Sequence, residues 1–147
     1  MQFINGLYAI FACFIIVTSI FFVTVIPHKL RWLRISKFYN GFLLLCSILL
    51  IVGVALQFQD NFNCDERLIM FFPLYSITFL LLYKLCDYIA LKKLKRHMYY
   101  LTMRGIYDEE SINSTIIENI AQFAVIAISI YFPMTLSSWI AKIWYSC

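Results

Sequence analysis

Four apolar runs, each long enough to cross a lipid bilayer, take up most of this 147-residue sequence. They cover about residues 3–26, 38–58, 68–91 and 121–143, and the first two hold no charged side chain. At about 1.5 Å per residue, a helix of residues 3–26 is longer than a hydrocarbon core of about 30 Å. With 63% hydrophobic and 14% charged residues, the composition is not that of a soluble domain. The sequence predicts an all-α polytopic membrane protein, a single domain of residues 1–147 with four transmembrane helices.

Single residues within the runs predict how the helices begin, bend and pack. Residues 1–5 carry no positive charge, whereas a cleaved signal peptide needs a basic start, so we expect the first run to be an uncleaved span. The third run is expected to start at Leu68, so Pro73 falls in its second turn, where a mild kink is possible. Gly41 and Gly53 in the second run allow another helix to approach closely. We therefore expect a homo-oligomer.

Lysine and arginine residues are distributed unequally between the connections. Ten of the twelve lie in or beside the first and third connections: Lys29, Arg31, Arg34, Lys37, Lys84, Lys92, Lys93, Lys95, Arg96 and Arg104. Only Arg67 and Lys142 lie on the other side. The positive-inside rule then places both connections in the cytoplasm and both termini outside it, in a bacterial-type inner membrane.

The third connection, about residues 92–120, predicts a cytoplasmic helical hairpin that extends the third and fourth runs. Gly105 suits the left-handed residue that ends the first helix of the hairpin. Asp108 suits the N-cap of the second helix, with Glu109 and Glu110 in its first turn. We expect this second helix to enter the membrane without a break.

Antiparallel pairing of the two arms places the basic arm against the acidic arm. In this register Arg96 lies near Ile116, and Lys92 lies near Ile120. Because the outer loops are short, the hairpin is the polar surface best suited to a soluble cytoplasmic protein partner. We expect docking to use eight charged residues: Lys92, Lys93, Lys95, Arg96, Arg104, Asp108, Glu109 and Glu110.

The same register places Lys84 and Asp87 inside a membrane boundary near Leu91. Spaced three residues apart on one helix, the two side chains can neutralise each other. Charges at membrane depth are costly, which makes this embedded ion pair a functional candidate. The alternative is that Lys84 extends to the headgroups and Asp87 already lies at the surface. The sequence leaves both interpretations open.

Two cysteines, Cys64 and Cys147, fall on the outer, oxidising side of the predicted topology. A disulfide between them requires Cα atoms about 4–7 Å apart, which a sequence does not reveal. A bridge and two free thiols are therefore equal alternatives.

Residue patterns typical of catalysis or metal binding are absent from the sequence. There is no Cys-x-x-Cys pair for thiol exchange, and the first run lacks the carboxylate of a proton-coupled exporter. His28 and His97 lie among cations, and we expect both to be solvated interfacial residues and not metal ligands. The basic residues 92–96 are expected to contact anionic lipid headgroups in preference to nucleic acid. We expect membrane lipids as partners, no cofactor and no enzyme activity.

These features favour a non-enzymatic, oligomeric membrane subunit that anchors or senses and docks a soluble partner through its hairpin. In span number and size the chain resembles the small four-helix membrane subunits of two-gene anti-phage defence systems such as Kiwa, which implies a role in antiviral defence. One alternative is a pore-forming, holin-like or ion-conducting oligomer. It would need a polar stripe along a span, for which the candidates are Ser47, Gln57, Ser76, Thr78, Ser129, Thr135 and Ser137. Another is a lipid- or quinone-handling enzyme, which would need clustered acidic or histidine residues at the membrane surface.

Overall fold

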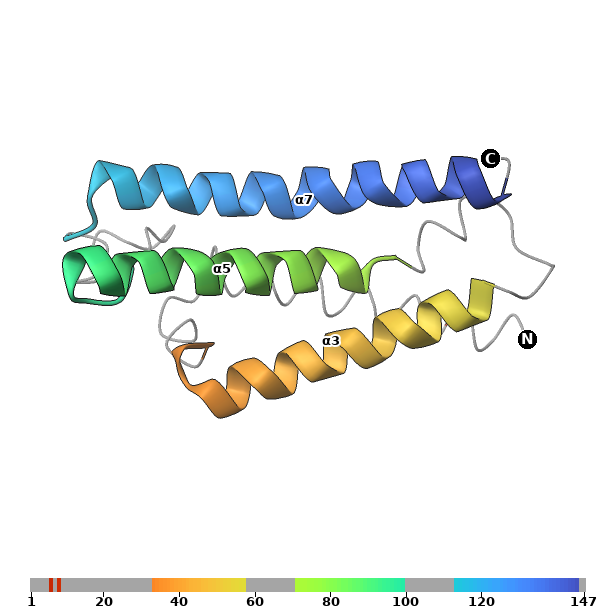
Figure 1. Cartoon of the computed structure of the whole chain (residues 1–147), viewed down its shortest axis with the longest axis horizontal. Helices are drawn as coiled ribbons and strands as arrows, with labels where there is room; N and C mark the ends of the chain where they lie inside the picture. The colour runs from red at the N-terminus through yellow and green to blue at the C-terminus, as the bar shows by residue number, and fades with distance from the viewer. Residues whose placement is uncertain (1–5, 7, 9–32, 58–70, 100–112, 146–147) are drawn as a thin grey trace.

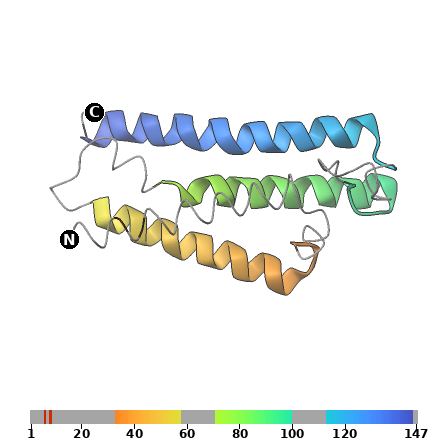
Figure 2. The ribbon, with the colours of Figure 1, turned by 180° about the vertical axis from the view of Figure 1, so that it is seen from behind.

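Three long helices make up most of the described structure. The computed structural model describes residues 6, 8, 33–57, 71–99 and 113–145. Helix α3 is Ser36–Gln57, α5 is Pro73–Leu94 and α7 is Ile116–Tyr145. Helix α5 lies between the other two and runs antiparallel to both (Figures 1 and 2). The prediction of an all-helical architecture is confirmed for these residues, whereas nearly all of the first run lies outside them.

All three helices are long and apolar enough to cross a membrane. The predicted runs 38–58 and 121–143 coincide with α3 and with most of α7. The outward faces of all three helices carry large exposed apolar side chains, including Leu44, Ile48, Ile51, Leu81, Leu85, Ile128, Phe132, Met134 and Trp139. Apolar side chains on every outward face suit contact with lipid, so the helices indicate a membrane protein.

Helix α5 begins at Pro73, later than the sequence predicted. Before it, Phe71 and Phe72 form a turn in which their carbonyls accept hydrogen bonds from the amides of Leu74 and Tyr75 at 2.9 and 3.1 Å. Proline suits the first helical position because the amide that it lacks would have no partner there. The prediction that Pro73 lies in the second turn of this helix is therefore wrong, because Pro73 is its first residue.

Helix α5 also ends earlier than predicted, at Leu94 and not near Gly105. Lys95 takes the left-handed conformation that the sequence assigned to Gly105, with φ of 59°. The chain then reverses, and residues 96–99 run back beside the helix; we call them the return segment. Hydrogen bonds from the return segment to buried carboxylates, described below, compensate for the lost helical turns.

Because a lysine side chain is strained in the left-handed region, we expect Lys95→Gly to stabilise the protein by about 0.5–1 kcal/mol. The control is Lys93→Gly, inside the last turn of α5, which should destabilise by about 1 kcal/mol. The free energies of unfolding can be measured by titrating the detergent-solubilised protein with sodium dodecyl sulfate. Equal destabilisation by the two substitutions would contradict the left-handed end of α5.

Helix α7 begins at Ile116, after a non-helical stretch of residues 113–115. The Thr115 hydroxyl accepts a hydrogen bond from the Glu118 amide at 3.3 Å, and a Glu118 carboxylate oxygen accepts one from the Thr115 amide at 2.9 Å. This reciprocal arrangement is a capping box. The prediction of an unbroken helix from Asp108 into the membrane is therefore wrong at residues 113–115, and Asp108 itself lies outside the described residues.

The core lies between α5 and its two neighbours. It is formed by Tyr39, Phe79, Leu80, Tyr83, Ala90, Met98 and Val125. Tyr39 reaches across from α3 and donates its hydroxyl hydrogen to the Leu80 carbonyl at 3.3 Å. Met98, which is 2% exposed, enters this core from the return segment and not from a helix. Non-helical backbone is therefore part of the packed bundle.

Candidate functional site: a polar cluster at one end of the bundle

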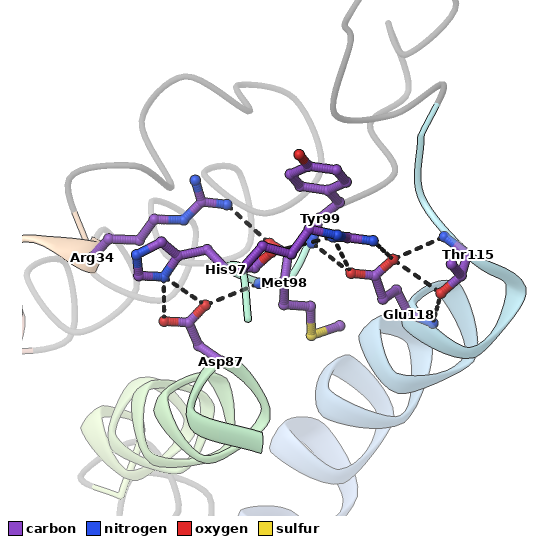
Figure 3. Close-up of polar contacts among 8 residues, drawn as sticks. Arg34, Asp87, His97, Met98, Tyr99, Thr115 and Glu118 are labelled. Carbon is purple, nitrogen blue, oxygen red and sulfur yellow. Dashed lines mark hydrogen bonds and ion pairs between the residues drawn. The ribbon is translucent and has the colours of Figure 1, made fainter. Parts of the chain in front are cut away.

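A cluster of polar contacts joins α5, α7 and the residues just before α3 at the end of the bundle where α5 ends and α7 begins (Figure 3). Its eight residues, called the polar cluster below, are Arg34, Asp87, Arg96, His97, Met98, Tyr99, Thr115 and Glu118. Arg34 precedes α3, Asp87 belongs to α5, and Thr115 and Glu118 cap and begin α7. The remaining four are the return segment. The cluster therefore connects elements that are distant in sequence.

Asp87 holds the return segment against α5. Its carboxylate is 2% exposed and accepts a hydrogen bond from the Met98 amide at 3.1 Å. The Nδ1 atom of His97 lies 3.0 and 3.1 Å from the two carboxylate oxygens. A carboxylate only accepts hydrogen bonds, so Nδ1 is the donor in this contact. The buried carboxylate on this apolar helix thus receives its hydrogen bonds from the residues that follow the chain reversal.

Met98 is fixed at three points. Its amide binds Asp87, its side chain is in the core, and its carbonyl accepts a hydrogen bond from an Arg34 terminal nitrogen at 2.9 Å. Backbone without helical hydrogen bonds is costly to bury unless its polar groups find other partners. These contacts let the return segment pack between the helix ends.

Glu118 is the acceptor for the α7 side of the polar cluster. It is 4% exposed and forms a two-pronged ion pair with Arg96, with nitrogen to oxygen distances of 2.7 and 3.1 Å. The same carboxylate accepts hydrogen bonds from the Tyr99 amide at 3.0 Å and from the Thr115 hydroxyl at 2.9 Å. The Arg96 guanidinium also stacks 3.8 Å from the centre of the Tyr99 ring. Paired donors of this kind give strong and directional contacts.

The predicted ion pair between Lys84 and Asp87 is not the one that the structure forms. Asp87 faces inward and takes His97 and Met98 as partners. Lys84 faces outward, with its Nζ atom 5.2 Å from the centre of the Tyr39 ring. The reversal of the chain after Lys95 brings His97 and Met98 to Asp87, whereas a continuous helix would have carried both residues away from it.

The predicted docking residues divide into two groups. Lys92, Lys93 and Lys95 are exposed at the end of α5, whereas Arg96 is drawn into the polar cluster. Arg104, Asp108, Glu109 and Glu110 lie outside the described residues, as do Cys64 and Cys147 of the possible disulfide. The predicted register placed Arg96 near Ile116, two residues from its actual partner Glu118.

Sequence reasoning missed four contributors to the polar cluster: Arg34, His97, Thr115 and Glu118. His97, expected to be solvated, has a side chain that is 43% exposed and bound to Asp87. Arg34 was counted only as a cation, although it binds the Met98 carbonyl. Thr115 and Glu118 did carry a signal, because Thr-x-x-Glu before an apolar run is the sequence pattern of a capping box. That signal alone could have placed the start of α7.

The chemistry of the polar cluster is that of a structural network. Both buried carboxylates already accept several hydrogen bonds from the chain. Within the described ranges, no three His, Cys, Asp or Glu side chains gather closely enough to hold a metal ion. The arrangement fixes a bend of the chain and leaves the neighbouring lysines at the surface.

No known protein family, curated protein or solved structure matches this chain. Among the described residues, the polar cluster and the lysines beside it are the features that need a functional explanation.

Proposed function

We propose that this protein is a non-enzymatic, oligomeric membrane subunit that docks a soluble cytoplasmic protein at the end of the bundle that holds the polar cluster. The observation that supports this proposal is that hydrogen bonds attach the return segment to α5, to α7 and to Arg34, which directly precedes α3. Lys92, Lys93 and Lys95 are exposed directly before it. A basic surface on a fixed support suits a partner with an acidic face.

Rigid support favours docking for an energetic reason. Ordering a loop at the moment of binding costs free energy, which a preorganised surface avoids. Here the partly buried ion pair between Arg96 and Glu118 and the hydrogen bonds to Asp87 hold the backbone in place before any partner arrives. The three lysines add electrostatic attraction, which raises the rate of encounter with an acidic protein.

The proposed topology has four spans, with this end of the bundle in the cytoplasm and both termini outside. The uneven distribution of lysine and arginine supports this orientation. The subunit would lie in a bacterial-type inner membrane. A place in a two-gene anti-phage defence system remains part of the proposal, supported by span number and size.

The pore alternative receives little support from the described residues. A channel-lining stripe needs hydroxyls that face a shared path, but the hydroxyls of Ser47, Thr78 and Ser129 bond to carbonyls four residues back in their own helices. Ser129 and Ser137 are moreover buried within the chain, 6% and 4% exposed. These hydroxyls serve the packing of the bundle, so the anchoring function fits them better.

The test of the proposed function places a photo-crosslinking amino acid at position 93, in place of Lys93. The bacterial cells used also produce the proteins encoded by the neighbouring genes. Crosslinking at Lys93 should give one adduct with a soluble protein that mass spectrometry identifies. The matched control is the same amino acid at Lys142, an exposed lysine near the far end of α7, which should not give this adduct. Charge reversal of Lys92 and Lys95 to glutamate should reduce the adduct severalfold.

Orientation is measured separately, with an azide-bearing amino acid at the same two positions and a membrane-impermeant cyclooctyne. Intact cells should react at position 142 and not at position 93, and permeabilised cells at both. Reaction at position 93 in intact cells would overturn the proposed topology. The same soluble adduct from both positions, or none from Lys93, would overturn the docking proposal.

A further inference from the structure

Lys84 is a cation on the outward face of a helix that is otherwise apolar around it. Its neighbours on that face, Leu81, Leu85 and Tyr88, are each more than half exposed. Its Nζ atom lies 5.2 Å from the centre of the Tyr39 ring. The hydrogen bond from Tyr39 to the Leu80 carbonyl fixes that ring between α3 and α5. The ammonium group is therefore held at the boundary between two helices, over an aromatic face.

The chain supplies no carboxylate for this cation in the part that the structure describes. Asp87, one turn further along α5, faces the interior and is bound to His97 and Met98. Glu118, the other buried carboxylate, is paired with Arg96. A cation on a lipid-facing surface is costly unless an anion or water reaches it. Among the described residues, Lys84 therefore has an aromatic ring as its neighbour and no carboxylate as its counter-charge.

The depth of Lys84 suits the headgroup of a lipid. If the membrane boundary lies near Leu91, Lys84 lies seven residues inside it, about 10 Å along the helix axis. Lysine side chains at such positions extend along the helix so that the ammonium approaches the headgroups. Exposed Tyr88 lies one turn nearer the boundary, where tyrosine is enriched in membrane proteins. Lys84 and Tyr88 together suit the binding of a phosphate group.

We propose that Lys84, held over the Tyr39 ring and with exposed Tyr88 one turn away, binds the phosphate of an anionic phospholipid whose acyl chain lies along Leu81 and Leu85. This inference rests on the membrane placement given under Proposed function, but not on the docking of a protein. The positive charge is complementary to the anionic lipids of a cytoplasmic leaflet. The adjacent apolar side chains distinguish a lipid from a free phosphate ion, which would gain nothing from them.

The test uses the purified full-length protein in nanodiscs of equal parts phosphatidylglycerol and phosphatidylcholine, released into the gas phase for native mass spectrometry. The wild type should retain phosphatidylglycerol in preference to phosphatidylcholine. Lys84→Met should lower that preference about fivefold, the factor that corresponds to about 1 kcal/mol for one cation near a membrane surface. Lys84→Arg, which keeps the charge, should retain most of the preference.

The matched control is Lys142→Met, which removes one exposed positive charge at the other end of the bundle and should leave the preference unchanged. Melting temperatures of all variants confirm that each is folded, and Lys84→Gln replaces Lys84→Met if the latter is not. No preference in the wild type, or an equal loss in the Lys142 variant, would overturn the lipid site. Crosslinking at Lys93 needs no phosphatidylglycerol preference, so the two proposals fail independently.

Discussion

Replacing Glu118 with alanine is expected to destabilise the protein by about 3–5 kcal/mol, because it breaks a partly buried ion pair and removes the acceptor of two backbone amides. The substitution leaves the Arg96 guanidinium, the Tyr99 amide and the Thr115 amide without their shared acceptor. Unfolding free energies in mild detergent, titrated with sodium dodecyl sulfate, measure the loss.

The conservative variant Glu118→Gln separates charge from shape. It keeps one acceptor oxygen and should cost about half as much. Arg96→Met should have a smaller effect than Glu118→Ala, because three hydrogen bonds to the carboxylate remain. A loss below about 1 kcal/mol for Glu118→Ala, a value typical of exposed pairs, would mean that this carboxylate is solvated.

Asp87→Leu is expected to have the second largest effect, a loss of about 3 kcal/mol in the free energy of unfolding. Leucine suits the surrounding core but leaves the Met98 amide buried without an acceptor and releases His97. Asp87→Asn retains an acceptor for the Met98 amide and should cost about 1–2 kcal/mol. The same detergent titration measures both variants.

A double-substitution cycle tests which partner Asp87 uses. The effects of Asp87→Asn and Lys84→Met should add within about 0.5 kcal/mol, because the two side chains do not touch in the structure. The effects of Asp87→Asn and His97→Gln should be coupled, because those side chains are bonded. Additive effects in the second cycle and coupling in the first would restore the ion pair that the sequence suggested.

The helices themselves could be predicted from the sequence, because length and apolar character suffice to identify them. Residues 36–57 and 116–145 form helices around the apolar runs predicted at 38–58 and 121–143. The start of α5 was misplaced because apolar residues precede Pro73 and hydropathy does not register the missing proline amide. Local backbone chemistry, which hydropathy ignores, decided that boundary.

The polar cluster could be predicted from the sequence only in part. The antiparallel register, counted outward from Gly105, placed Arg96 within two residues of its partner Glu118. The inward position of Asp87 could not be predicted, because it depends on the reversal of the chain at Lys95. A left-handed lysine is energetically unfavourable on its own and is stabilised here by tertiary contacts that no local pattern encodes.

The spacing of the polar cluster along the chain sets an order for its assembly during synthesis. His97 and Met98 follow Asp87 by only 10 and 11 residues, so this carboxylate can be satisfied soon after α5 leaves the ribosome. Arg96 and Glu118 are separated by 22 residues, and their ion pair must wait until the next helix has emerged. Contacts that are close in sequence form with the smaller loss of chain entropy. Completion of this end of the bundle is therefore coupled to the insertion of α7.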